Sequence, residues 1–228
     1  DFSDVSPKLA LVHRMSESRR VFASLTRATR APQTTDLYRL RDADRTGPLE
    51  PDPADVDSET LDSFEIGYRS FSSGLSYEVS LFAMRKENYH FRDGSDYYET
   101  DGETSHEGVE LELDWQINDA LSLHSGVSWA KHEYAFNRDV TGGNALETIT
   151  DGNYIDSAPK TLGNSTLRWQ ATPRLSAAAQ WEHVGSYYMD ASNTQKYDGH
   201  DLINLALNMN LREGVSLEAR VLNLFDED

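Results

Sequence analysis

The sequence predicts an all-β protein, and more specifically an antiparallel transmembrane β-barrel with about ten strands in this chain. Three observations support this prediction. Apolar and polar residues alternate with a period of two, short polar turns alternate with long loops, and several predicted strands are longer than those of soluble proteins.

The alternation is clearest in residues 109–115, where Val, Leu, Leu and Trp occupy the odd positions and acidic residues the even ones. The same period appears in residues 64–69, 76–83, 121–129, 203–211 and 215–221. A strand places successive side chains on opposite faces, so each segment has one apolar and one polar face. We expect the charged side chains of the polar face to point into the barrel, namely Glu65, Arg69, Glu110, Glu112, Asp114, Arg168, Glu182, Glu218 and Arg220.

Two kinds of connection alternate along the chain. Compact polar turns are predicted at residues 16–18, 72–74, 118–120, 172–174 and 213–214. Between them lie longer connections rich in Asp, Glu, Gly, Asn and Tyr, at about 27–60, 92–103, 138–157 and 190–199. This asymmetry is typical of outer-membrane barrels, in which the turns are periplasmic and the loops extracellular.

Strand length and tryptophan positions agree with a membrane location. Residues 75–91 and 121–136 exceed the five or six residues of an ordinary soluble strand. Trp115 and Trp169 stand just before short turns, where a periplasmic aromatic girdle would lie. Because ten strands with a charged inner face cannot close a wide barrel, we expect the chain to be a fragment of one.

Composition excludes several classes of protein. The 228 residues carry a net charge of −18, which argues against a nucleic-acid partner. No apolar run is long enough for a membrane helix, and the absence of cysteine excludes disulfides and thiolate metal sites. The polar start at Asp1 is not a signal peptide, so for an exported protein we expect further sequence upstream.

Four segments together resemble TonB-dependent receptors. Residues 20–32 (RVFASLTRATRAP) resemble the family's strand ending in Arg-Ala-Pro, and residues 58–69 (SETLDSFEIGYR) resemble its "PE…EiGyk" strand, with Ser58 where proline is usual. Residues 105–112 (SHEGVELE) resemble the "GvElel" strand, and residues 221–226 (VLNLFD) the "NLFD" motif near the family's C-terminus.

The resemblance implies an outer-membrane transporter with a plugged barrel of about 22 strands. Residues 1–228 would then be part of its C-terminal barrel domain, without the plug, the TonB box and the last strand. The implied function is import of a bulky nutrient, most simply a ferric-siderophore-type iron complex, although cobalamin, haem and sugar receptors share these motifs. The implied partners are the TonB complex, outer-membrane lipid, lipopolysaccharide and the iron chelate.

Candidate ligand-binding residues are aromatic and basic side chains of the long connections, since such groups can hold an anionic, aromatic iron chelate. The main candidates are Arg30, Tyr38, Arg92, Tyr97, Tyr98, Tyr154, Tyr187 and Tyr188, and the wider set adds Arg39, Arg41, Tyr89, His90 and Tyr134. The alternative role for these tyrosines is an outer interfacial belt.

Three other functions remain open: a passive porin-like channel, a soluble all-β module that binds carbohydrate or another ligand, and an enzymatic barrel. The sequence shows no nucleophile motif, so we predict neither catalysis nor a cofactor. A calcium loop beginning at Asp42 fails because Pro53 stands where a bidentate Glu is needed, and no metal site is predicted.

Overall fold

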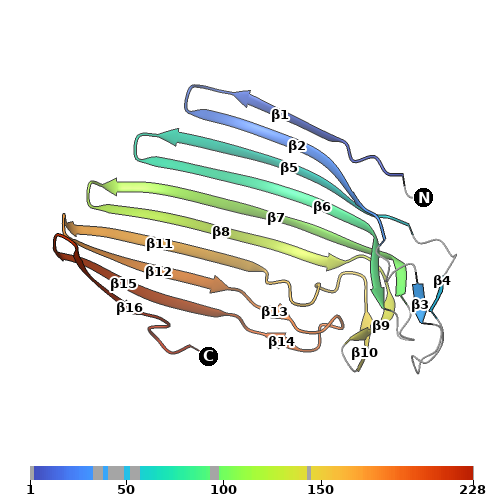
Figure 1. The fold of residues 1–228 in the computed structure, drawn as a ribbon. Coiled ribbons are helices and arrows are strands. Elements are labelled where there is room, and N and C mark those ends of the chain that lie inside the picture. Colours follow the sequence, from blue (N-terminus) through green and yellow to red (C-terminus); the bar gives the residue numbers. More distant parts are fainter. Residues whose placement is uncertain are drawn as a thin grey trace.

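A computed structural model of the chain describes residues 3–32, 38–40, 49–51, 57–92, 98–142 and 145–227. Within these residues ten strands form one antiparallel sheet in which strands adjacent along the chain lie side by side (Figure 1). They are β1 (Lys8–Arg14), β2 (Arg19–Arg30), β5 (Glu59–Ser72), β6 (Leu75–Arg92), β7 (Tyr98–Asn118), β8 (Leu121–Tyr134), β11 (Thr161–Thr172), β12 (Leu175–Val184), β15 (His200–Arg212) and β16 (Val215–Val221). The predicted all-β, antiparallel fold is confirmed.

The predicted turns join the strands pairwise at one end of the sheet, and the long connections gather at the other (Figure 1). Gly74 and Gly214 have φ angles of 90° and 75° in two of the turns, a conformation that side chains other than glycine rarely adopt. The long connections contain three small hairpins: β3 (Tyr38–Leu40) with β4 (Leu49–Pro51), β9 (Arg138–Gly142) with β10 (Ala145–Ile149), and β13 (Tyr187–Tyr188) with β14 (Lys196–Tyr197).

The connection predicted at residues 92–103 is shorter in the structure. Strand β7 already begins at Tyr98, which lies opposite Arg92, and Phe91 lies opposite Glu99. The prediction of a loop was wrong for residues 98–103 because it rested on their Asp, Glu, Gly and Tyr content. Backbone pairing with β6 continues there, and irregularities on both sides of Tyr89 absorb the change in register.

Both faces of the sheet are exposed. On one face, side chains such as Trp169, Leu167 and Leu217 keep 53%, 40% and 51% of their surface accessible. Pairing places Leu167 beside Ala179 and Leu123, so the outward positions of neighbouring strands form a continuous apolar band. A soluble sandwich would bury such a band, and the structure therefore favours the membrane-barrel prediction over the soluble module.

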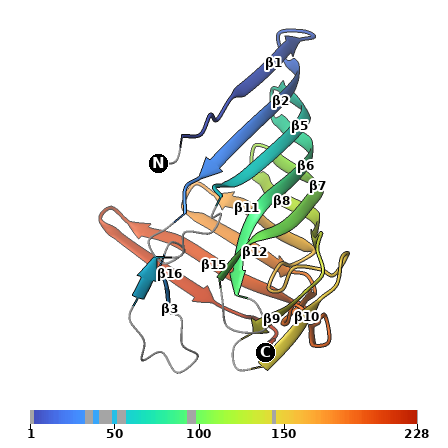
Figure 2. The ribbon, with the colours of Figure 1, turned by 90° about the vertical axis from the view of Figure 1, so that its right-hand side faces the viewer.

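The sheet is curved and, in the part that the structure describes, it is open, with β1 and β16 at its two edges (Figure 2). Among the residues that the structure describes, β1 pairs only with β2 and β16 only with β15. Among the described residues, no helix has the length and apolarity needed to span a bilayer.

Two glycines of the motifs noted above make room for aromatic rings. A Cβ atom at Gly67 would lie 2.2 Å from the ring of Phe22 on the neighbouring strand. At Gly108, it would lie 2.7 Å from the ring of Phe82 and 2.4 Å from the carbonyl oxygen of Trp129. Because Phe22 and Phe82 lie directly opposite these glycines, their rings can lie flat across the neighbouring strands.

Candidate functional site

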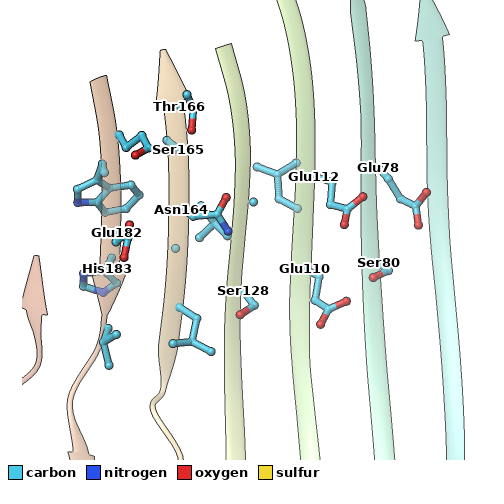
Figure 3. Close-up of a pocket in the computed structure, with 18 of the residues that line it drawn as sticks. Glu78, Ser80, Glu110, Glu112, Ser128, Asn164, Ser165, Thr166, Glu182 and His183 are labelled. Carbon is cyan, nitrogen blue, oxygen red and sulfur yellow. The ribbon is translucent and has the colours of Figure 1, made fainter. Parts of the chain in front are cut away.

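The polar face lines the hollow of the curved sheet. A shallow pocket of about 590 Å³ is bordered by strands β5 to β8, β11 and β12, and Glu78, Glu110 and Glu112 project from adjacent strands at its wall (Figure 3). Glu65 and Glu182 line the same pocket, and Asp114 and Arg168 line a second one nearer the turns. The inward orientation predicted for these residues is confirmed.

The inner wall carries excess negative charge. Arg69 forms an ion pair with Glu78. Among the described residues, Glu65, Glu110 and Glu112 have no cationic side chain within ion-pair distance. Since a carboxylate loses hydration when a partner covers it, whatever fills this lumen must bring positive charge or water to these groups.

On the outer face, charged residues begin just above the apolar band. Arg27 donates from Nε to Asp62 Oδ1 at 2.7 Å, and Asp62 lies opposite Arg85 on the next strand. Glu107 and Lys131 continue this charged row on β7 and β8. The apolar outward positions between the row and the turns, for example Val109 to Trp115 on β7, mark the membrane-spanning part of each strand.

The tryptophans mark the two borders of the band. Trp115 and Trp169 are exposed near the turns, as predicted for a periplasmic girdle, and Trp129 is exposed next to the charged row. Trp181 donates from Nε1 to Asp201 at 2.7 Å, and Asp201 also lies 2.9 Å from Nδ1 of His183. An apolar body with a polar contact at its upper edge is typical of tryptophan at a membrane interface.

At the loop end, a buried carboxylate ties three strands together. Glu59 is 4% exposed and forms ion pairs with Arg30 at 2.6 Å and Lys86 at 3.2 Å, and the backbone N–H of His90 donates to it. Burial raises the pKa of Glu59, but the His90 N–H and the two cations outweigh burial and hold the pKa below its ordinary value. Arg30, a predicted ligand residue, is therefore held in place by its ion pair with Glu59.

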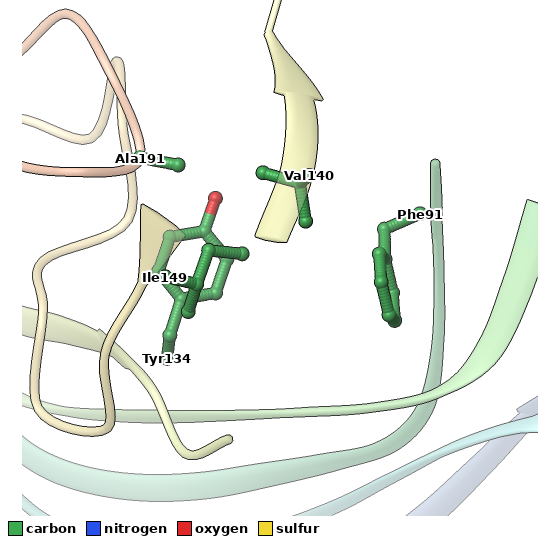
Figure 4. Close-up of a cluster of buried hydrophobic side chains, with 5 residues drawn as sticks. All are labelled: Phe91, Tyr134, Val140, Ile149 and Ala191. Atoms are coloured by element: carbon green, nitrogen blue, oxygen red, sulfur yellow. The ribbon is translucent and has the colours of Figure 1, made fainter. Parts of the chain in front are cut away.

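The loops around β9 and β10 have a small apolar core of their own. Phe91, Tyr134, Val140, Ile149 and Ala191 are buried together (Figure 4), and Tyr134 donates its hydroxyl proton to Asp156 at 2.6 Å. Burial, reinforced by this hydrogen bond, raises the pKa of Tyr134. This cluster joins strand ends to loops that are distant in sequence, so the loops are packed rather than loose.

Two long loops are hydrogen-bonded to each other. Asn193 accepts from the backbone N–H of Tyr154 at 2.7 Å and donates to the carbonyl oxygen of Tyr154 at 2.7 Å. The N–H of Ala191 donates to Glu147 at 2.6 Å, and the N–H of Thr148 donates to Ser192 at 2.7 Å. We call the joined residues 135–160 and 185–199 the loop unit.

The loop unit brings two predicted ligand residues together. The rings of Tyr154 and Tyr188 are stacked with centroids 6.0 Å apart, and the ammonium of Lys160 lies 3.8 Å from the centroid of the Tyr154 ring. Tyr187 pairs instead with Tyr197, at 5.1 Å between ring centroids.

The sequence analysis did not include Lys160 among the candidate ligand residues. Residues 135–160 contain only two cationic side chains, and this scarcity could have drawn attention to Lys160 as a partner for an anionic ligand. Arg30 lies in the separate Glu59 cluster described above. The side chains of Tyr38, Arg39, Arg92 and Tyr98, and all of Arg41 and Tyr97, lie outside the part of the chain that the structure describes. Of the failed calcium loop at residues 42–53, the structure describes only Leu49–Pro51, the strand β4.

In the described residues, no three His, Cys, Asp or Glu side chains are grouped so that they could hold a metal ion. A hydroxyl–imidazole–carboxylate chain does occur: Thr161 lies 2.9 Å from Nε2 of His183, whose Nδ1 contacts Asp201. It lies at the outer border of the apolar band, where Trp181 shares its carboxylate. We interpret it as part of the polar border.

Comparison with known proteins relates the chain to one family. The family model "TonB dependent receptor-like, beta-barrel" matches residues 1–224. A probable TonB-dependent siderophore receptor, PiuA of Acinetobacter baumannii, is 23% identical over 176 residues, which are 75% of this chain and 24% of that protein. The ferrioxamine receptor of Yersinia enterocolitica is 23% identical over 177 residues, or 74% of this chain and 24% of its own length.

Solved structures agree on the fold. The crystal structure of PiuA from Acinetobacter baumannii superposes with a TM-score of 0.78 at 19% identity, covering 96% of this chain and 31% of that one. The ferric yersiniabactin uptake receptor FyuA of Yersinia pestis gives 0.76 at 17% identity, covering 96% and 32%. The chain thus spans about a quarter of the length of the curated relatives it matches.

Proposed function

Because this chain belongs to the family of TonB-dependent receptors, we propose that it is part of an outer-membrane transporter that imports a bulky nutrient, and that the nutrient is a ferric-siderophore-type iron complex. Members of this family are outer-membrane β-barrel proteins, and two of the relatives above are named as siderophore or ferrioxamine receptors. The outer-membrane location of this chain is supported by its apolar band with aromatic borders.

The observation that carries the ligand proposal is the stacked pair Tyr154 and Tyr188 with the ammonium of Lys160 beside it. Many iron chelates are anionic and carry planar groups. A ring pair can stack against such a group, while an ammonium supplies the opposite charge. Because the loop unit already holds these side chains, little conformational entropy is lost when a ligand binds.

The remaining partners follow from the family and from the two faces of the sheet. We propose that further strands close the barrel at the edges of β1 and β16, and that a plug fills the acidic lumen. We also propose that TonB acts on a segment outside this chain. Lipid would contact the apolar band, and lipopolysaccharide the charged row that begins at Arg27 and Asp62.

The test uses the full-length receptor in cells whose own copy is deleted. Uptake of radioactive iron is measured with a panel of hydroxamate and catecholate ferric siderophores, with and without TonB. We expect TonB-dependent uptake of at least one of them, and a loss of about tenfold in affinity when Lys160→Gln is combined with Tyr154→Ala.

The matched control is Arg27→Gln, which removes one cation from the outer charged row on β2 and should leave uptake unchanged. Uptake that continues without TonB would favour the porin-like channel. Unaltered affinity in the Lys160/Tyr154 variant would refute the ligand site while leaving the transporter proposal standing.

A further inference from the structure

Two histidines and a methionine form a row across three adjacent strands of the inner wall. Met84 on β6 lies opposite His106 on β7, and His106 lies opposite His132 on β8. Directly opposed residues project from the same face of a sheet, and Glu110, on the same face as His106, lines the lumen pocket. The row lies on the loop side of Glu107 and Lys131, and therefore outside the membrane-spanning part of the strands.

The two imidazoles face each other through their Nδ1 atoms, which are 2.9 Å apart. Nε2 of His106 lies 3.0 Å from the hydroxyl of Thr104, which is 2% exposed. The hydrogen bond between Thr104 and His106 can run in either direction. In both cases one proton lies between the Nδ1 atoms of His106 and His132. A metal ion can replace that proton if each imidazole carries its proton on Nε2 instead, and no proton is then released.

The separation of the nitrogens limits the geometry of such a metal. With metal–imidazole bonds of about 2.0 Å, two nitrogens 2.9 Å apart subtend an angle of about 90° at the metal. This angle occurs between neighbouring ligands in the tetragonal geometry of Cu(II). A tetrahedral zinc ion would need the two nitrogens about 3.3 Å apart, so their present separation matches Cu(II) better. The thioether of Met84 is a soft donor of the kind that selects Cu(I).

Lys86 and Thr104 lie next to the two imidazoles. Lys86 is a cation that faces the row, and its ammonium forms an ion pair with Glu59, which also pairs with Arg30. Thr104 can fix the ring of His106 by accepting a hydrogen bond from its Nε2–H, as the hydrogen-bond partners of metal-bound histidines do.

We propose that His106, His132 and Met84 form a copper-binding site on the inner wall of the barrel. Both imidazoles bind through Nδ1, and the thioether completes the site and retains the metal when it is Cu(I). The site uses other side chains than the Tyr154, Tyr188 and Lys160 cluster, although the N–H of Ile155 donates to the carbonyl oxygen of His132. It does not depend on which nutrient is transported.

The experiment uses the purified full-length receptor in detergent micelles, with copper alone as the probe. Electron paramagnetic resonance follows Cu(II), and competition with a chromophoric chelator measures the affinity for Cu(I). We expect one copper per receptor, with hyperfine splitting from two imidazole nitrogens. His106→Gln or His132→Gln should weaken binding at least tenfold and abolish the two-nitrogen signal.

Met84→Leu should weaken Cu(I) binding and leave the nitrogen signal of Cu(II) intact. The matched control is His183→Gln, which removes an imidazole from the outer face and should leave copper binding unchanged. Heat-dependent mobility on denaturing gels establishes that each variant is folded. If His106→Gln does not fold, His132→Gln provides the test instead. Equal copper binding by wild type and both inner-wall histidine variants, or no binding by wild type, would overturn the proposal.

Discussion

Alanine at Gly108 is expected to destabilise the barrel because the new Cβ has no space. It would lie 2.4 Å from the carbonyl oxygen of Trp129 and 2.7 Å from the ring of Phe82. The ring can move, but the carbonyl belongs to the paired strand β8, so the backbone must shift. Overpacking of this kind costs about 1–3 kcal/mol, and the reduced freedom of the unfolded chain returns about 0.4–1 kcal/mol. We therefore expect a net loss of about 1–2 kcal/mol.

Gly126 provides a matched control on the neighbouring strand. A Cβ there would lie 3.3 Å from the amide of Asn164, which is the end of a flexible side chain. Gly126→Ala should therefore leave stability unchanged or raise it by up to about 1 kcal/mol. The free energy of unfolding of the full-length receptor in micelles, followed in urea by tryptophan fluorescence, distinguishes the two variants. If Gly108→Ala were as stable as Gly126→Ala, the close-approach explanation of this motif glycine would be wrong.

Three further predictions concern the loop end of the sheet. Glycine suits the φ angle of 58° at residue 193, so Asn193→Gly should lower the stability by about 1–3 kcal/mol only through the two lost hydrogen bonds to Tyr154. Asn193→Ala should lower it by about 1–2 kcal/mol more, because alanine is strained at this φ angle. Hydrogen exchange of residues 150–156 would show this, and unchanged exchange would contradict the coupling of the two loops. Tyr134→Phe should lower the stability by about 1–2 kcal/mol because Asp156 loses its hydrogen-bond donor. Tyr77→Phe on the outer face is the control and should leave the stability unchanged. Equal thermal stability of the two variants would count against this role of Tyr134. The folded pKa of Glu59 lies below its ordinary value of 4.5, so its ion pairs stabilise the fold fully above about that pH and less as pH falls through the folded pKa. The melting temperature of Glu59→Gln should accordingly lie below that of wild type at pH 7, and the difference should close in acid; a difference that persists unchanged at pH 3 would refute this assignment.

The alternation of residues could be read without a structure because it is local. A strand has a period of two, so Val109 to Trp115 determine their own apolar and acidic faces whatever their neighbours are. The compact turns, such as the one at Gly74, likewise depend on a few adjacent residues. The ten strands, their order and the acidic inner wall could therefore be predicted, and the family motifs extended this prediction to the barrel.

The tertiary structure alone decided which loop residues meet. Tyr154 and Tyr188 are stacked because two separate connections are hydrogen-bonded through Asn193, and no local pattern encodes that pairing. The same holds for His106 and His132, which face each other only in the register that β7 and β8 adopt. A shift of one residue would turn one ring to the outer face of the sheet. Local periodicity therefore determined which face each side chain occupies, whereas the stagger between strands and the packing of the loops decided which side chains come into contact.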